Sequence, residues 1–227
     1  MKDKFIKKYM RRAKAVAEDQ NPCLSRAIGA VIVDPVTNVT VSDGYNGPAK
    51  DVPHPDTYEF LAEYVYPQLT EEEKNAILNR NKDFILKTVY GNTIPENHAD
   101  LTFIVNNPDD FGMCFSGCKA CPRKLVGAIS GARLELCGCA HGERNAIANA
   151  AKAGHKVFGC YIFCWCGIPC LDCAVAIINA GITKVYCIGN ESRQAEKNAY
   201  RFENSVWQFK KSGVELIELD RDWVLED

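Results

Sequence analysis

The sequence predicts an α/β fold in which helices cover both faces of a five-stranded mixed sheet. Three observations predict it: an apolar helical repeat near the N-terminus, a continuous apolar run at 27–33, and regular alternation of strands with helices from residue 142 onwards. Strand–helix–strand alternation implies parallel strands, whereas two strands joined by a short turn are antiparallel. We therefore expect three parallel strands and one antiparallel hairpin.

The first elements are a helix and this hairpin. Apolar side chains recur every three or four residues over 3–18, and Pro22 lies beyond the end of the helix because proline cannot continue it. The strand at 27–33 is followed by turn residues and a second strand at 39–42. A loop at 43–48 closes the unit.

The segment at 50–112 has a different character. It holds five prolines, and Thr70 with Glu73 forms a capping-box pattern that begins a charged helix reaching about Lys87. We expect one domain over 1–227 in which this segment is a folded insertion, serving as a lid or a subunit contact.

The C-terminal half follows the strand–helix pattern closely. Helices are predicted at 142–153, 171–180 and 193–211, and strands at 157–165, 183–188 and 213–218. Cys160, Cys164 and Cys166 alternate along the first of these strands, which favours a packing role for most of them.

Composition excludes several classes of protein. A net charge of -2 with a pI near 6.1 provides no overall attraction for nucleic acids or anionic membranes. No apolar run reaches the roughly 18 residues of a membrane span, and the basic N-terminal segment lacks the uncharged core of a signal peptide. We expect a cytoplasmic protein, in the host cytoplasm if the chain is viral, that binds neither membranes nor nucleic acids.

The chain has twelve cysteines, and eleven of them lie between Cys114 and Cys187. This content is below that of disulfide scaffolds, and a chain of this length can bury a core without cross-links. Without an export signal, such a cluster indicates metal ligands or small buried side chains.

One group of residues has the types and spacing of a metal site. His141 opens one predicted helix, and Cys170 and Cys173 open the next, so that all three lie at helix N-termini on the same side of the sheet. One imidazole and two thiolates leave the fourth tetrahedral position of a zinc ion open, which is typical of a catalytic site.

Glu143 lies two residues after His141 and is not needed as a ligand. A carboxylate there can take a proton from a zinc-activated water and return it to a leaving group. The alternative is a solvated residue in the first helical turn, where a negative charge favours the helix dipole.

These residues, His-x-Glu followed by Pro-Cys-x-x-Cys, are the signature of zinc-dependent nucleobase deaminases, which this chain resembles. The deoxycytidylate deaminase branch is the most similar in the flanking motifs, over about 23–47 and 118–188. The matching residues are Ser25, Arg26, Gly29 to Val33, Gly44 to Gly47, Cys121 to Arg123, Ser130, Gly131, Leu134, Cys137, His141, Glu143 and Asn145 to Ile147.

This resemblance implies a cytidine deaminase-like αβα sandwich and a hydrolase acting on the C–N bond of a cyclic amidine. The reaction would convert dCMP to dUMP and ammonia, with zinc as cofactor and Glu143 as the proton carrier. Asn46, the backbone N–H of Gly142, Ser25 and Arg26 would bind the substrate. For Arg26, an exposed cation at a strand end is an equal alternative.

Deoxycytidylate deaminases resemble one another in forming homohexamers that dCTP activates and dTTP inhibits. The resemblance therefore implies nucleoside triphosphate effectors, carrying Mg2+, at the loop Gly44, Tyr45, Asn46 and Gly47. A turn selected for the backbone preferences of glycine and asparagine is the alternative.

The chain departs from the family pattern at two places. Gly142 stands where alanine is usual, and Cys164 and Cys166 stand where the strand commonly has tyrosine and threonine. These departures concern the lining of the pocket and leave the metal ligands intact.

A second zinc site is a further hypothesis. Cys118, Cys121, Cys137 and Cys139 have nearly the spacing of a structural zinc knuckle, with His98 as a spare ligand. The alternative is a set of reduced, buried thiols.

Other functions stay open at this point. The chain could deaminate another cytosine nucleoside or nucleotide, or cytosine within a polynucleotide, although it lacks the basic aromatic tract that tracks phosphates. It could also be a zinc-stabilised nucleotide sensor without catalysis, in which case Glu143 would have no role.

Overall fold

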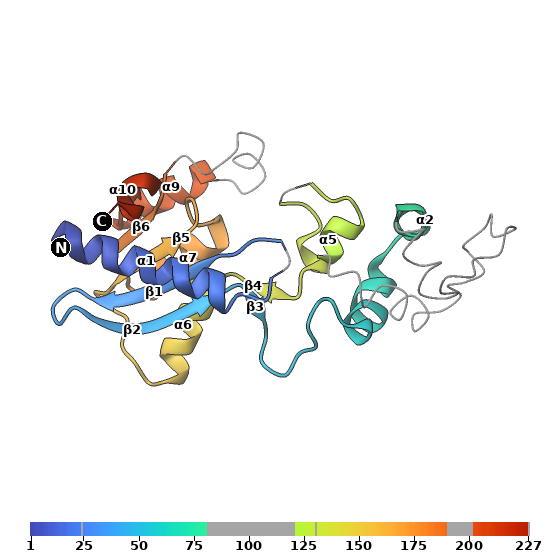
Figure 1. Ribbon diagram of the computed structural model, residues 1–227, viewed down its shortest axis with the longest axis horizontal. Helices are drawn as coiled ribbons and strands as arrows, with labels where there is room; N and C mark the ends of the chain where they lie inside the picture. The colour runs from blue at the N-terminus through green and yellow to red at the C-terminus, as the bar shows by residue number, and fades with distance from the viewer. Residues whose placement is uncertain (24, 81–120, 130, 190–201, 227) are drawn as a thin grey trace, which may run out of the picture. The chain divides into compact units, whose positions relative to one another are not determined.

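The structure is a computed structural model that describes residues 1–23, 25–80, 121–129, 131–189 and 202–226. The chain divides into two compact units, one formed by 1–47 with 140–227 and the other by 48–139 (Figure 1). The predicted single domain with an insertion at 50–112 stays a prediction.

The first unit is built on a five-stranded sheet with the order β2-β1-β5-β6-β7. Its strands are β1 (Gly29–Asp34), β2 (Val39–Tyr45), β5 (Tyr161–Trp165), β6 (Lys184–Ile188) and β7 (Glu215–Leu219). β1 is antiparallel to β2 and to β5, whereas β5, β6 and β7 are parallel. The predicted mixed sheet, with three parallel strands and a hairpin, is confirmed.

The hairpin is longer than predicted. β2 pairs with β1 as far as Tyr45, which lies opposite Gly29, and a two-residue strand β3 (Gly47–Pro48) follows. The loop predicted at 43–48 was therefore wrong over most of its length, because strand pairing continues past the turn-forming residues.

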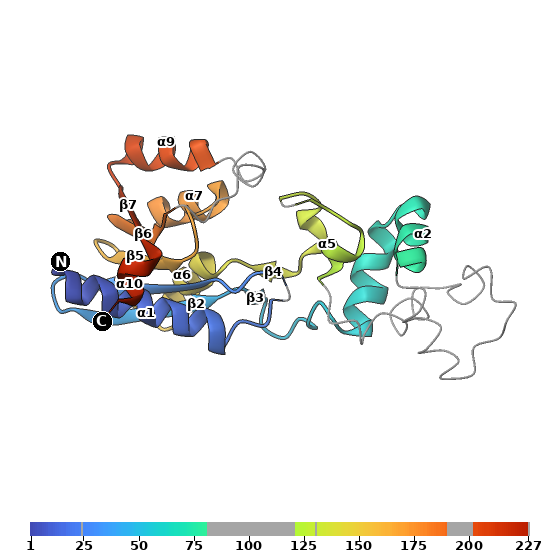
Figure 2. The ribbon, with the colours of Figure 1, turned by 45° about the horizontal axis from the view of Figure 1, so that its top comes forward.

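Helices cover both faces of this sheet (Figures 1 and 2). On one face, α1 (Asp3–Asp19) and α10 (Arg221–Leu225) pack on the side chains of Val31, Phe163 and Tyr186. On the other face lie α6 (Gly142–Lys152), α7 (Leu171–Asn179) and α9 (Phe202–Ser212). Alternate residues of β1, β5, β6 and β7 thus enter two separate apolar cores.

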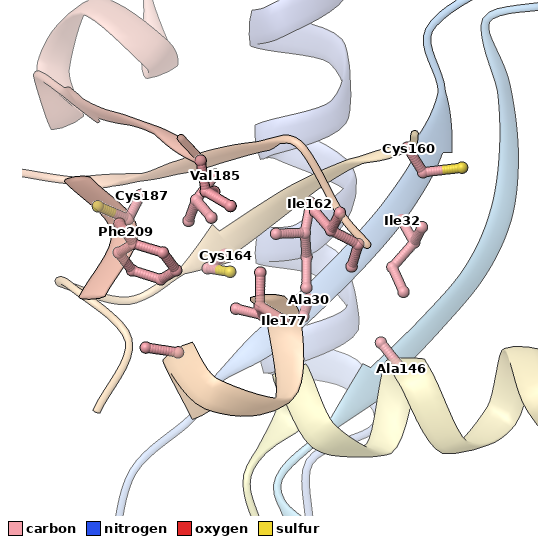
Figure 3. Packing of buried hydrophobic residues seen from close by; sticks show 13 residues of the cluster. Ala30, Ile32, Ala146, Cys160, Ile162, Cys164, Ile177, Val185, Cys187 and Phe209 are labelled. Atoms are coloured by element: carbon pink, nitrogen blue, oxygen red, sulfur yellow. The ribbon is translucent and has the colours of Figure 1, made fainter. Parts of the chain in front are cut away.

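The second of these cores contains Cys164 of β5 and Cys160, which directly precedes β5. Figure 3 shows Cys164 of β5 in one cluster with Ile177 of α7 and Phe209 of α9, and Cys160 belongs to the same cluster. Both thiols are buried, so the predicted packing role is confirmed for these two residues.

Most predicted boundaries agree with the structure to within a few residues. β5 begins four residues late because a turn, in which Gly159 has φ of 81°, precedes it. The start of the predicted helix at 193–211 lies outside the described residues, which resume at Phe202. The short helix α10 was not predicted.

The second unit is largely helical and irregular where it is described. It contains η1 (Phe60–Val65), η2 (Tyr66–Gln68), α2 (Glu71–Arg80), α5 (Pro122–Leu125), η3 (Leu134–Leu136) and the start of β4 (Cys139–Ala140). The predicted capping box is confirmed, since Glu73 N–H donates to Thr70 Oγ1 at 3.2 Å and Thr70 N–H donates to Glu73 Oε2 at 3.0 Å. Residues 81–120, which include the predicted helix end at Lys87, lie outside the described part.

Arg133 joins the separate pieces of this unit. Its guanidinium forms ion pairs with Glu73 and with Glu135, and it donates to the carbonyl of Gln68 at 3.0 Å. The hydroxyl of Tyr64 also donates to the carbonyl of Glu135, at 2.8 Å.

Among the described residues of the whole chain, no helix combines the length and apolar character needed to cross a membrane.

In the first unit, α6 lies unusually close to β2. A Cβ added at Gly44 would be 2.2 Å from the backbone nitrogen of Ala146 and 2.6 Å from the carbonyl oxygen of Gly142. Polar side chains tie the two elements together: Ser42 Oγ donates to the carbonyl of Ala146, and Asn145 Nδ2 donates to that of Tyr45, each at 2.8 Å.

This packing predicts that Gly44→Ala lowers the free energy of unfolding by about 1–3 kcal/mol, the usual cost of overpacking. Urea denaturation measures the change. Gly189→Ala is the matched control, because its added Cβ meets no atom nearer than 3.4 Å. Equal denaturation midpoints for the two variants would show that α6 can move away from β2 freely.

Candidate metal centre and active site

Two helix N-termini bring three metal-ligating side chains together. His141 immediately precedes α6 and Cys170 immediately precedes α7, both with extended backbone, while Cys173 lies in the first turn of α7. His141 Nδ1 is 3.4 Å from Cys170 Sγ and 3.5 Å from Cys173 Sγ. The three residues singled out in the sequence therefore meet at one point, and their ligand atoms lie within 4.8 Å of one another.

The electrostatics of this trio favour a bound cation. A hydrogen bond from the Cys173 thiol, assisted by His141, lowers the pKa of Cys170 to about 4. That same hydrogen bond raises the pKa of Cys173. Burial lowers the pKa of His141, but its hydrogen bond to Cys170 and the negative charge of Glu143 outweigh this effect and raise it. The site thus already stabilises a thiolate.

The donor set fits zinc. One imidazole nitrogen and two sulfurs are ligands that zinc prefers, and three protein ligands leave one coordination position for water or substrate. Within the described ranges, no other group of three or more histidine, cysteine or acidic side chains comes as close together. The arrangement is consistent with a catalytic zinc ion.

Glu143 lies in the first turn of α6, and its carboxylate is buried with only 2% of the residue exposed. Oε1 accepts a hydrogen bond from the thiol of Cys166 at 3.6 Å. Oε2 has no hydrogen-bond partner among the described residues. The alternative of a solvated residue at the helix start is therefore wrong, since the carboxylate is inside the protein.

Asn46 and Gly142, both expected near the substrate, contact each other. The N–H of Gly142 donates to Asn46 Oδ1 at 2.8 Å, and Asn46 Nδ2 donates to the carbonyl of Arg26 at 3.3 Å. Asn46 is 4% exposed, whereas Ser25 and Arg26 are half-buried. The structure thus brings Arg26, Asn46 and Gly142 into one hydrogen-bonded chain, and their roles toward a substrate stay predictions.

The residues expected to bind effectors fall into two environments. Gly44 and Tyr45 end β2, and Gly44 packs against the backbone of α6. Gly47 starts β3, and neither glycine has a positive φ. The glycine at position 44 is required by close packing, not by a turn, so the alternative of a turn does not explain it.

Three cysteines of the hypothetical second metal site lie in the second unit. The thiol of Cys137 is hydrogen bonded to those of Cys121 and Cys139. The backbone N–H groups of Arg123 and Lys124 donate to the sulfur of Cys121. The other two residues of that hypothesis, Cys118 and His98, lie outside the described residues.

The contact between Cys166 and the Glu143 carboxylate was not predicted from the sequence. Alternation along the strand favoured packing for most of Cys160, Cys164 and Cys166, and only the family pattern, in which threonine is usual at position 166, pointed to a hydrogen-bond donor there. The contact depends on β5 ending beside the start of α6, and periodicity within one strand does not predict it.

Comparisons with known proteins agree with this site. The profile of the "Cytidine and deoxycytidylate deaminase zinc-binding region" matches residues 3–189. A comparison with curated protein sequences finds no match.

Solved structures with a similar fold include dCMP deaminase from the cyanophage S-TIM5. Its complex with dCMP and dUMP is 19% identical with a TM-score of 0.50 and covers 96% of this chain and 99% of that one. The corresponding values for its apo form are 17%, 0.48, 96% and 100%.

A deaminase/reductase of Thermotoga maritima, whose full name is diaminohydroxyphosphoribosylaminopyrimidine deaminase/5-amino-6-(5-phosphoribosylamino)uracil reductase, is 16% identical with a TM-score of 0.45. The match covers 95% of this chain and 36% of that one.

The family profile extends over most of the chain, and the predicted zinc ligands meet in space. The chain therefore belongs to the cytidine and deoxycytidylate deaminase zinc-binding family.

Proposed function

We propose that this protein hydrolyses dCMP to dUMP and ammonia. The observation that carries the proposal is Glu143, a buried carboxylate two residues after His141 whose Oε2 has no hydrogen-bond partner in the described part of the chain. A buried polar atom is costly to leave unsatisfied, so an unpartnered oxygen beside a metal centre is best explained by a role toward water or substrate. A zinc-stabilised sensor would have no use for it.

The residues of this chain account for the proton transfers. Zinc held by His141, Cys170 and Cys173 supplies the Lewis acidity that lowers the pKa of water. Oε2 of Glu143 accepts a proton from the attacking water, whose oxygen forms a bond to C4 of the cytosine ring. Glu143 passes this proton to ring N3, then takes the second proton from the hydroxyl now on C4 and delivers it to the amine. The C4–N4 bond breaks as the C4 carbonyl forms, and ammonia leaves.

The choice of dCMP as substrate rests on the motifs that resemble the deoxycytidylate deaminase branch. In this proposal Asn46 and Gly142 lie at the pyrimidine, while Ser25 and Arg26 lie toward the phosphate. The hydrogen bonds of Asn46 with the carbonyl of Arg26 and with the N–H of Gly142 support it, because they hold the backbone at Arg26 near the start of α6. A net charge of -2 favours a free nucleotide over a polynucleotide.

Regulation is part of the same proposal. A homohexamer would bind dCTP as activator and dTTP as inhibitor, each with Mg2+, near Tyr45 and Gly47. Tyr45 supports a link to catalysis, since its carbonyl accepts a hydrogen bond from Asn145 of α6 at 2.8 Å. A ligand that moves this strand end would therefore move the helix that carries Glu143.

We also propose a second, structural zinc ion in the second unit. Support comes from the contacts of the Cys137 thiol with those of Cys121 and Cys139, which lower the pKa of Cys137. A lowered pKa favours the thiolate, the form that binds zinc, whereas the same contact raises the pKa of Cys121. Reduced thiols that pack without metal are the alternative outcome.

Replacing the proton carrier tests the chemistry. Glu143→Gln keeps the volume of the side chain but removes the base, so we expect kcat on dCMP to fall by about 10²–10⁴-fold. Ammonia release measures kcat, and atomic emission should show unchanged zinc content. Glu72→Gln, at an exposed position of α2, is the control and should keep full activity. Undiminished turnover in Glu143→Gln would contradict the mechanism.

A substrate panel tests specificity and regulation. We expect turnover of dCMP to exceed that of deoxycytidine, CMP and a cytosine-containing oligonucleotide, because the phosphate and the absent 2′-hydroxyl are both recognised. Adding dCTP should raise the rate and dTTP should lower it, and analytical ultracentrifugation should show a hexamer. Preference for the oligonucleotide, or indifference to both triphosphates, would contradict the corresponding part of the proposal.

Metal stoichiometry tests the second zinc. The zinc content of the purified chain should fall by one ion in His141→Ala and, separately, by one ion in Cys121→Ser. Cys23→Ser is the matched control and should keep the full content. A wild-type chain whose entire zinc content disappears in His141→Ala would exclude the second site.

A further inference from the structure

Cys166 links the end of β5 to the carboxylate of Glu143. It directly follows β5, whereas Glu143 lies in the first turn of α6, so the contact joins two elements separated by 23 positions in the sequence. The donor is a thiol and the acceptor is Oε1, with 3.6 Å between sulfur and oxygen. This distance is suitable for a hydrogen bond from sulfur, which is larger and a weaker donor than oxygen.

The two oxygens of Glu143 are thereby made unequal. Oε1 is held by Cys166, while Oε2 is buried and unpartnered among the described residues. A carboxylate with one fixed oxygen cannot rotate freely about its terminal bond, so the free oxygen keeps a defined direction. Proton transfer requires this kind of alignment between the base and the reacting group.

The thiol of Cys166 keeps its proton and can donate it. Its hydrogen bond with Cys164, together with burial and the negative charge of Glu143, raises the pKa of Cys166. The hydrogen bond with Cys166 lowers the pKa of Cys164, but burial outweighs this effect and raises it to about 11. The single proton of Cys166 therefore has two acceptors within reach, the sulfur of Cys164 and the carboxylate of Glu143, and the carboxylate is the stronger acceptor.

We infer that Cys166 is a positioning residue for deamination: its thiol holds Oε1 of Glu143 so that Oε2 stays free to move protons. The inference rests on the proposed function, because it assigns the contact to the proton-transfer step. A thiol suits this task since its hydrogen bond is weak. It orients the carboxylate while drawing little negative charge from the oxygen that must accept a proton.

Three variants test the role in catalysis. Cys166→Ala removes the donor, and we expect kcat to fall about tenfold with KM close to that of the wild type, because alignment and not binding is lost. Cys166→Ser restores a donor and should recover most of kcat. Cys160→Ala is the matched control, since Cys160 is buried in the same core and contacts the carbonyl of Lys156, not Glu143.

Zinc content and melting temperature must match the wild type for these comparisons. If Cys166→Ala is unstable, Cys166→Val replaces it, because valine refills the volume without a donor. Wild-type kcat in a donorless variant that is folded and zinc-loaded would overturn the inference. Failure of serine to recover activity lost in that variant would also overturn it.

Infrared spectroscopy tests the contact without any substrate. The difference spectrum between wild type and Cys166→Ala isolates the S–H stretching band of Cys166, and Glu143→Gln should move this band to higher wavenumber because an amide is a weaker acceptor. An unmoved band would overturn the inference. If the wild type deaminates no cytosine nucleotide, the proposed function fails, and the band still reports separately whether the thiol holds the carboxylate.

Discussion

The close approach of α6 to β2 is the constraint on which the site depends. Two glycines meet there: a Cβ at Gly44 would lie 2.2 Å from the nitrogen of Ala146, and a Cβ at Gly142 would lie 3.0 Å from the carbonyl oxygen of Gly44. The departure of Gly142 from the alanine usual in the family thus has a steric explanation. Because His141 and Glu143 flank Gly142, this contact determines where both side chains lie.

The parallel part of the sheet supplies the other half of the site. The chain leaves β5 and reaches Cys170 within five residues, and α7 then begins. Both α6 and α7 point their N-termini at the same place, where the partial positive charge of each helix end stabilises thiolates and carboxylates. The backbone therefore also contributes to the stabilisation of anionic ligand atoms at this place.

Cysteine performs several distinct tasks within this small region. Cys170 and Cys173 carry candidate ligand atoms, Cys164 fills the core, and Cys166 contacts the carboxylate of Glu143. The neighbour of each thiol separates these tasks: Cys164 is buried in the apolar core, whereas Cys166 is half-buried beside Glu143. A protonated thiol next to an apolar core acts as a small hydrophobic group, whereas the same group beside a carboxylate is a donor.

The sequence was most informative where a local pattern has a local cause. The helical repeat of α1, the apolar run of β1, the capping box at Thr70 and the strand–helix alternation after His141 each reflect the period of one element or the chemistry of one helix end. Ligand spacing was equally informative, since Cys170 and Cys173 share one helical turn whatever surrounds them. The sequence by itself thus determined the mixed sheet and the three residues of the candidate zinc site.

Only the tertiary structure decided how these parts meet. The extension of β2 to Tyr45, the steric need for Gly44 and the partner of Cys166 all arise from contacts between segments distant in the chain. No periodicity records such contacts, because each depends on the distance between two backbones set by the packing of many other residues. Residue types along the chain therefore determined which chemistry is possible, and packing decided which oxygen of Glu143 is held and which is left free.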